Sequence, residues 1–409
     1  MRVKRSAEHY VQQGRLLLLF GTMVGGGCSG PESGVEFTSR DSAGVAIGTT
    51  SRQPGVWRTD DEPLLQLGSV DESGPTQFFR IVDIALLRDG GVAVANQGSE
   101  EIRVFGPDGA HRGTAGGRGS GPEEFSGLQM IAAFGDSLLT WDGGNARISV
   151  RRADGSFARG FRLEWHNGIL FPVALVDADV SQGRRPGILA VTARYMSELN
   201  GSGLVVDTAL VSLYDMQGSM VDSLARVPHN SRAVRRVGNR QTTLGVPYVP
   251  NASIEGYEDG FCYTFGPDAH ILCHGPQRLK QILRVDIPDR PVTERDVARY
   301  WDEAFKTQLA SRRSALNRMR DVMPFPDRFP AFAQLLRDDT GRLWARRYPL
   351  PTAEEEEWLV FDNGKWIGGV ASPLGFRVMD VRGRRLAGVW RDSVGVEYVR
   401  IYRYKPGND

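Results

Sequence analysis

Four arginines in the segment "SRAVRRVGNRQ" offer the clearest ligand-binding chemistry in the sequence: Arg232, Arg235, Arg236 and Arg240. A guanidinium group binds a carboxylate or another anion through two parallel hydrogen bonds. The segment is a predicted loop that leads into a strand, so in a fold with a central pore it could overhang the pore and bind an anionic ligand. The alternative is an exposed loop whose charge balances acids elsewhere.

Metal-binding and catalytic patterns are missing from the residue spacing. The six histidines include no His-x-x-x-His or His-x-His pair with a nearby carboxylate, and His270 and His274 would lie about 13 Å apart along one strand. No Gly-x-Ser-x-Gly segment occurs. Asn96 and Asp142 are better explained as turn residues than as calcium ligands. We therefore predict no metal site and no cofactor, and we assign no catalytic residue.

The stretch "GRGSGPEEF" at residues 117–125 looks like a phosphate-binding loop. Such a loop needs Gly-Lys-Ser/Thr, or glycines that enter a helix. Here Gly121 and Pro122 end the glycine run, and residues 128–141 have a strand pattern. We interpret the stretch as a connector between two β-units, with Phe125 packed between them.

Cys262 and Cys273 lie in two short β-runs that a turn at Pro267-Asp268 would join. The register that pairs Phe265 with His270 places the two cysteines directly opposite each other, close enough for a disulfide. The alternative is a pair of buried thiols, and a slip of one residue would put the sulfurs on opposite faces.

Two segments repeat each other at a distance of 46 residues: "LLRDGGVAVANQGSEEIRVFGPDG" (86–109) and "AAFGDSLLTWDGGNARISVRRADG" (132–155). Each has an apolar strand, an Asn- or Asp-rich turn, an alternating strand and an Asp-Gly turn, which favours a hairpin. Weaker copies occur at 210–224, 335–348, 358–370 and 375–405. Units of about 40–60 residues with four short strands are typical of a β-propeller.

The predicted fold class is therefore all-β, a single β-propeller over residues 43–405. The spacing favours six blades, with seven as the alternative, because residues 166–330 are diluted by loops and a helix. The first strands, around Val45–Ile47 and Leu64–Leu67, are expected beside Val396–Tyr402, where they would complete the last blade and close the ring.

One segment, residues 293–323, has a helical period instead. Thr293 is a candidate N-cap, and apolar residues such as Val297, Trp301 and Phe305 follow at helical spacing until Pro324. We expect a helical insertion on the rim of the propeller. The alternative is a lid or partner-binding element.

The N-terminus has the order of an export signal. Basic residues precede a short apolar run at 16–24, and small residues lead to Cys28. This predicts a signal peptide (1–27), lipidation of Cys28 and a flexible tether (28–42); the alternative is plain secretion. The protein would then lie in the cell envelope, held to the membrane by lipid alone, or in the periplasm or outside the cell. Residues 406–409 are a tail.

The charge balance excludes one class of partner. Fifty Lys and Arg residues against 49 Asp and Glu give a net charge of +1, which provides no electrostatic basis for nucleic-acid binding. The acidic run Glu354–Glu357 is predicted to be a solvated loop tip, and the alternative is a contact with calcium or with a basic partner.

The segments "SAGVAIGTTSRQPGVW", "LLQLGS", "IRVFGPDG" and "GGRGSGPEEF" resemble bacterial exported six-bladed β-propeller proteins related to the NHL-repeat group. The resemblance covers roughly residues 40–405. It implies a fold rather than a function, because the group includes binding scaffolds and enzymes.

The expected function is a non-enzymatic binding or scaffold protein of the cell envelope. It would be monomeric and would engage a protein, peptide or glycan through its rim or pore face. One alternative is a lactone hydrolase or lyase with a metal site at the pore face. Another is a purely structural component of an assembly.

Overall fold

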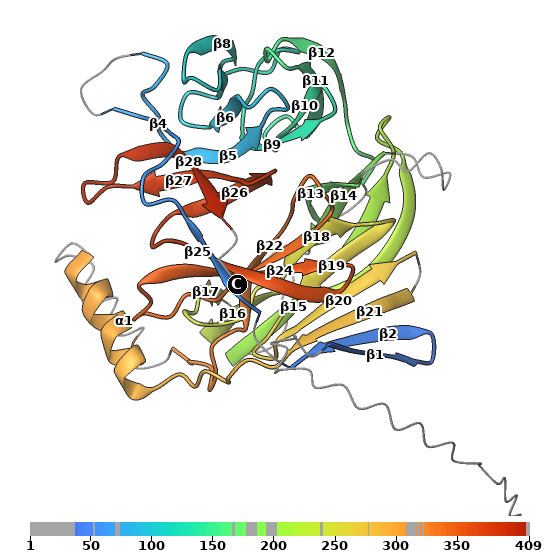
Figure 1. Ribbon diagram of the computed structural model, residues 1–409, viewed down its shortest axis with the longest axis vertical. Coiled ribbons are helices and arrows are strands. Elements are labelled where there is room, and N and C mark those ends of the chain that lie inside the picture. Colours follow the sequence, from blue (N-terminus) through green and yellow to red (C-terminus); the bar gives the residue numbers. More distant parts are fainter. Residues whose placement is uncertain are drawn as a thin grey trace, which may run out of the picture. The chain divides into compact units, whose positions relative to one another are not determined.

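The described part of the protein is mostly β-structure. The computed structural model describes residues 37–51, 54–69, 74–165, 168–176, 186–193, 203–237, 240–276, 278–307, 317, 320 and 323–405. Within these ranges the strands run from β1 (Phe37–Ser42) to β28 (Glu397–Lys405), and one helix is present, α1 (Glu294–Thr307) (Figure 1). The predicted signal peptide, Cys28 and the tail at 406–409 lie outside the described residues.

The two clearest sequence repeats form two antiparallel sheets of four strands. Their strands are β5 (Ile81–Leu86), β6 (Val92–Asn96), β7 (Glu101–Phe105) and β8 (His111–Gly116), then β9 (Leu128–Phe134), β10 (Ser137–Asp142), β11 (Arg147–Arg152) and β12 (Phe157–Phe161). The Asp-Gly turns form as predicted. The side chains of Asp108 and Asp154 each accept the backbone N–H two residues further on, and Gly109 and Gly155 have φ of 82° and 87°, where glycine is favoured.

Asn96 and Asp142 make hydrogen bonds that reach beyond the turns predicted for them. Asn96 Oδ1 accepts the backbone N–H of Phe79 at 2.9 Å, and Asp142 Oδ1 accepts that of Ser126 at 3.2 Å. Each side chain thus ties the end of the second strand of its sheet to the segment that leads into the first strand.

The remaining sheets follow the same antiparallel order. Their strands are β13 (Ile169–Val176), β14 (Gly187–Ala193), β15 (Gly203–Tyr214), β16 (Met220–Val237) and β17 (Arg240–Leu244); β18 (Ser253–Tyr257), β19 (Gly260–Thr264), β20 (His270–Gly275) and β21 (Arg278–Val285); β22 (Phe332–Arg337), β23 (Leu343–Arg347), β24 (Glu355–Asp362) and β25 (Lys365–Pro373); and β26 (Arg377–Arg382) and β27 (Arg385–Arg391) with β28.

The first strands of these sheets contact one another in a closed cycle. β5 contacts β9, and the contacts continue through β13, β18, β22 and β26 back to β5. The apolar core lies between the faces of successive sheets: for example, Ala85 of β5 packs with Ile131 of β9, and Val389 of β27 packs with Ile84 of β5. Sheets that pack face to face around a ring of first strands form a β-propeller.

The chain ahead of β5 pairs with three different sheets. β2 (Val45–Thr50), which pairs with β1, lies parallel to β21; β3 (Val56–Thr59) lies parallel to β25; and β4 (Leu65–Leu67) lies antiparallel to β28. We call residues 37–51 and 54–67 the strap. Trp57 fixes its middle, because its ring stacks on Tyr404 with centroids 5.8 Å apart. The strap therefore covers the outer strands of three consecutive sheets and protects their edges.

The strap corrects one expectation and confirms another. Leu65–Leu67 pair with β28, as predicted for the strand that completes the last sheet. Val45–Ile47 do not reach that sheet, because β2 pairs with β21 instead. Strand β1 begins at Phe37, inside the range expected for the flexible tether.

The predicted helix is present as α1, and residues 308–316 lie outside the described residues. Thr293 is its N-cap: the Asp296 backbone N–H donates to Thr293 Oγ1 at 3.3 Å, and Asp296 Oδ2 accepts the Thr293 backbone N–H at 3.0 Å. The apolar face centres on the buried Trp301, which clusters with Ala233 of β16 and with Val249. The helix thus packs beside the end of β16 (Figure 1).

Two loop expectations have opposite outcomes. Residues 117–125 are a connector between the first two sheets, as predicted: Phe125 is fully buried in the core between them, and the Arg151 guanidinium lies 4.5 Å from its ring centroid. The acidic run is not a loop tip, because Glu355–Glu357 begin β24. Glu356 is buried against Arg346, at 3.3 Å.

Candidate functional site

A cavity of about 480 Å³ lies where the first strands of the sheets meet. β5, β9, β13, β18, β22 and β26 all contribute to its lining. Its volume is in the range of ordinary ligand-binding pockets, roughly 300–1,000 Å³. We call it the central cavity.

The two sides of the central cavity differ in chemistry. The side formed by β9 and β13 is apolar and consists of Met130, Ile131, Ala132, Ala133, Ala174 and Leu175. The opposite side, formed by β5, β18, β22, the turn after β22 and β26, carries the polar residues Asp83, Glu255, Gln334, Arg337, Asp338, Asp339, Arg377, Asp380 and Arg382. The cavity is therefore amphipathic.

β-Bulges place several of these side chains. The pairing with the neighbouring strand shifts between Ile81 and Asp83, between Phe332 and Gln334, and between Val378 and Asp380. A bulge inserts one extra residue and re-aims the side chains that follow it. In each of these strands the first residue after the shift is a polar residue of the cavity lining.

Asp83 and Asp380 hold neighbouring first strands together. Asp83 Oδ2 accepts the backbone N–H of Ile131 on β9 at 2.9 Å, and Asp380 Oδ2 accepts that of Leu86 at the end of β5 at 2.6 Å. Side-chain bonds of the same kind join β18 to β22, where Ser253 Oγ accepts the Leu335 N–H, and β22 to β26, where Gln334 donates to the Val378 carbonyl. Both carboxyls therefore have a structural role, whatever else they bind.

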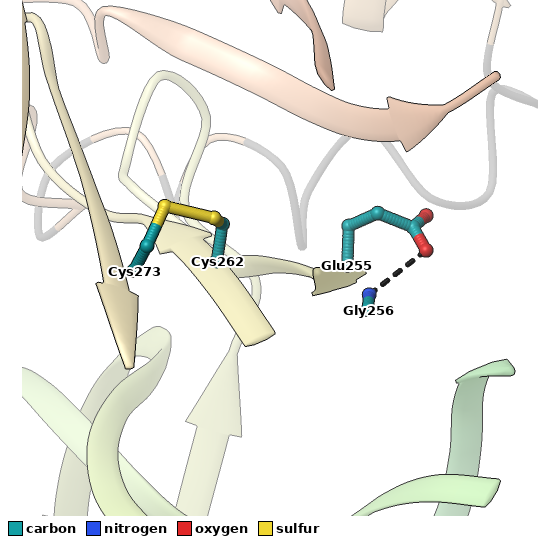
Figure 2. Close-up of a disulfide and its surroundings, with 4 residues drawn as sticks. All are labelled: Glu255, Gly256, Cys262 and Cys273. Carbon is teal, nitrogen blue, oxygen red and sulfur yellow. Dashed lines mark hydrogen bonds between the residues drawn. A yellow bond between two sulfur atoms is a disulfide. The ribbon is translucent and has the colours of Figure 1, made fainter. Parts of the chain in front are cut away.

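Glu255 is the third carboxyl of the cavity. Its Oε1 accepts the N–H of Gly256 at 2.9 Å (Figure 2). The positive charge of Arg337 on β22 lowers the pKa of Glu255. Arg337 also donates a hydrogen bond to the carbonyl of Leu175 on β13 at 3.2 Å. Glu255 therefore lies between the charged side of the cavity and the start of the apolar side.

Enclosure by protein shifts all three carboxyls toward the neutral form. Burial raises the pKa of Asp83 to about 7, that of Glu255 to about 8 and that of Asp380 to about 6. For Asp83, two backbone N–H donors and the charge of Arg377 oppose this increase in pKa, while the charge of Asp380 adds to it. At neutral pH the cavity therefore contains protonated and ionised carboxyls together, which can donate as well as accept hydrogen bonds.

Arg377 is the most accessible cation of the cavity. Its Nη2 donates to the carbonyl of Ile81 at 2.9 Å, and the residue is exposed. Arg382 differs, because it lies 3.9 Å from Asp339 Oδ2 in an ion pair. An accessible guanidinium beside raised-pKa carboxyls is suited to hold the polar groups of a ligand.

The arginines singled out in the sequence lie in strands. Arg232, Arg235 and Arg236 belong to β16 and Arg240 to β17, so the segment is a strand hairpin and the predicted loop is wrong. Arg232 is not among the residues that line the central cavity, and the side chains of the other three lie outside the described part of the structure. A role of the four arginines in ligand binding stays a prediction.

The structure brings Cys262 and Cys273 together. They are opposite each other in the β19–β20 pair, and their sulfurs are bonded at 2.00 Å. Glu255 is the cross-strand partner of Cys262 on the other side, so the three side chains project from the same face of this sheet (Figure 2). The disulfide thus joins the second and third strands of this sheet, next to the first strand, which carries Glu255 and lines the cavity.

No metal centre emerges from the described residues. Within those ranges, no group of three or more His, Cys, Asp or Glu side chains is arranged to hold a metal ion. The same part of the chain contains no helix that is long and apolar enough to cross a membrane.

The carboxyls of the cavity were missed in the sequence because each is alone in its strand. A signal was nevertheless present: the first and last repeats contain "RIVDI" (80–84) and "RVMDV" (377–381), with an aspartate inside an apolar strand and an arginine three residues before it. A charged residue at the same place in two strands predicted to be buried indicates a shared site.

Solved structures of other proteins are similar to this chain at low sequence identity. No family model and no curated protein sequence matches the chain. A candidate exported protein of Bacteroides fragilis matches 87% of this chain and 99% of its own, with 12% identity and a TM-score of 0.45. A DUF4221 family member of Bacteroides vulgatus (87% and 100% covered, 10% identity, TM-score 0.45) and the virginiamycin B lyase of Staphylococcus aureus (82% and 98% covered, 10% identity, TM-score 0.38) are also similar. Likeness at this level supports no inference about activity.

Proposed function

We propose that this protein is an exported, non-enzymatic binding propeller whose central cavity engages a polar group of a protein, peptide or glycan. The observation that carries the proposal is the amphipathic cavity at the meeting point of the first strands. Its charged side offers donors and acceptors in fixed positions, and its apolar side offers surface that a ligand can bury.

The architecture proposed with this function is a ring of six blades. The cycle of contacts β5–β9–β13–β18–β22–β26 supports it, and β4 supports closure by an N-terminal strand. The order of charged, apolar and small residues before Cys28 supports export and a lipid anchor in the cell envelope. The proposed form is a monomer.

Blocking the cavity tests the function. The change Ala132→Phe adds a ring to a half-buried residue of the apolar side, and Ala110→Phe at an exposed turn is the matched control. The mature protein and both variants are used as bait in envelope extract, and the captured peptides, proteins and glycans are identified. The proposal expects a ligand that is retained by the wild type and the control and lost by Ala132→Phe; equal capture by all three contradicts a cavity site.

The second candidate is an enzyme of lactone hydrolase or lyase type. The pKa of Asp83, raised to about 7 by burial, favours it, because a general acid or base works best near the operating pH. This alternative was expected to include a metal site at the pore face. Among the described residues, no three His, Cys, Asp or Glu side chains are arranged to hold a metal ion. Elemental analysis of the purified protein separates the two candidates: stoichiometric metal would support the enzyme.

A further inference from the structure

We propose that the ligand of the central cavity is a short zwitterionic peptide with aliphatic side chains, bound with its carboxylate at Arg377 and its ammonium group at Glu255. This inference rests on the proposed binding function and names the chemical class of the ligand. It is derived from the arrangement of charge on one side of the cavity and of apolar surface on the other.

The charged side carries both signs. Arg377 acts electrostatically on Asp83, and Arg337 acts on Glu255, so an arginine lies near an acid at each place. A ligand with a single charge would meet a group of its own sign at either place. A ligand with one positive and one negative end can pair with an acid and with an arginine at once.

Arg377 is suited to the carboxylate end. The residue is exposed, and its bond to the Ile81 carbonyl uses Nη2, one of the nitrogens of the guanidinium fork. A guanidinium holds a carboxylate through parallel hydrogen bonds that an amide or a hydroxyl cannot match.

Glu255 is suited to the ammonium end. The groups around it are Arg337 from β22, Asp380 from β26 and Asp83 from β5, while β13 contributes Ala174 and Leu175 and β19 contributes Cys262. Arg337 has the largest effect of these charges on Glu255, and Asp380 and Asp83 act in the opposite direction. With Glu255 itself, three acids lie near one arginine, so a cation can be accommodated here. The Glu255 carboxyl is held neutral by burial, so an arriving ammonium group would ionise it and release a proton.

The apolar side accounts for the side chains of the peptide. Met130, Ile131 and Leu175 line this side of the cavity. The lining residues that β9 and β13 contribute include no charged side chain. A polyhydroxylated sugar would leave its hydroxyls against this surface unpaired, whereas an aliphatic side chain loses no hydrogen bond there.

The test is isothermal titration calorimetry of the mature protein with four probes: Ala-Leu-Ala, its N-acetyl form, its C-terminal amide and cellotriose. Each titration is run near neutral pH in phosphate and in Tris, whose ionisation enthalpies differ, so that the number of protons released is measured directly. We expect Ala-Leu-Ala to bind with release of up to about one proton, and each blocked form to bind about tenfold or more weakly.

Variants assign the two ends. The Arg377→Gln variant should bind Ala-Leu-Ala only as tightly as the wild type binds the C-terminal amide, and its affinity for the amide should be unchanged. The Glu255→Gln variant should bind Ala-Leu-Ala without releasing a proton. Arg88→Gln, an exposed arginine paired with Asp136 outside the cavity, is the control. Equal binding of blocked and free peptides, or binding without proton release, would overturn the inference. Tight binding of cellotriose instead would overturn it while leaving the proposed function intact. The cavity-blocking experiment tests that function independently, by the loss from Ala132→Phe of a ligand that the wild type retains.

Discussion

Replacement of Glu255 by glutamine should make the protein less sensitive to alkaline pH. Burial raises the pKa of Glu255 from its ordinary 4.5 to about 8. The folded protein therefore keeps a proton that the unfolded chain releases, and stability falls as the pH rises from 4.5 to about 8. Glutamine has a similar shape, keeps an oxygen that can accept the Gly256 N–H, and carries no charge.

The size of the effect follows from the pKa difference. At about 1.4 kcal/mol per pKa unit, the shift has an upper limit of about 5 kcal/mol at alkaline pH. Water in the cavity screens part of this, so we expect the advantage of Glu255→Gln over the wild type to grow by about 2 kcal/mol between about pH 5 and pH 9.

Urea unfolding followed by tryptophan fluorescence measures this difference at each pH, because the titration of every group that does not interact with Glu255 is shared by the two proteins. Glu258→Gln is the matched control, since Glu258 is exposed and lies on the turn of the same hairpin. A difference in unfolding free energy that stays constant across the pH range would refute the reasoning, because it would mean that Glu255 titrates alike in the folded and unfolded states.

Three further predictions concern the scaffold and the N-terminus. The denatured, unreduced mature protein should show no reactive thiol from Cys262 or Cys273, and replacing both by alanine should cost about 2–3 kcal/mol of unfolding free energy; two titrated thiols would contradict this. Trp57→Ala should cost about 2 kcal/mol by removing the stack of the strap on Tyr404, with the exposed Val394→Ala as a control that leaves the urea midpoint unchanged. The intact mass of the protein from its native host should correspond to a lipidated chain that begins at Cys28, and an unmodified chain that begins elsewhere would contradict the anchor.

The sequence predicts local structure well in this protein, because local signals decide it. The Asp-Gly turns at Asp108 and Asp154, the N-cap at Thr293 and the buried Phe125 follow from chemistry within a few residues of each site. The cross-strand pairing of Cys262 with Cys273 has the same origin, because a short turn sets the register of a hairpin.

Pairing over long distances is decided by the ring and not by the local pattern. β2 reads as an ordinary half-buried strand, yet its partner β21 lies more than 200 residues away in the chain. An alternating strand fits any open sheet edge, so its partner depends on which edges the closed ring leaves uncovered. For this reason Val45–Ile47 were placed in the wrong sheet, while Leu65–Leu67, whose partner closes the ring, were placed correctly.

The polar side of the central cavity was beyond the reach of sequence patterns for a related reason. In a regular strand, successive side chains point toward the two neighbouring sheets, where apolar residues are expected. A single aspartate in such a strand therefore breaks the pattern without indicating a site. The bulges before Asp83 and Asp380 depend on strand pairing, and each bulge turns such a residue toward the cavity. Both aspartates then hold the next strand of the ring by a backbone N–H. The same two carboxyls thus join the first strands and supply charge to the cavity, so a ligand that changes their protonation also acts on the bonds that close the ring.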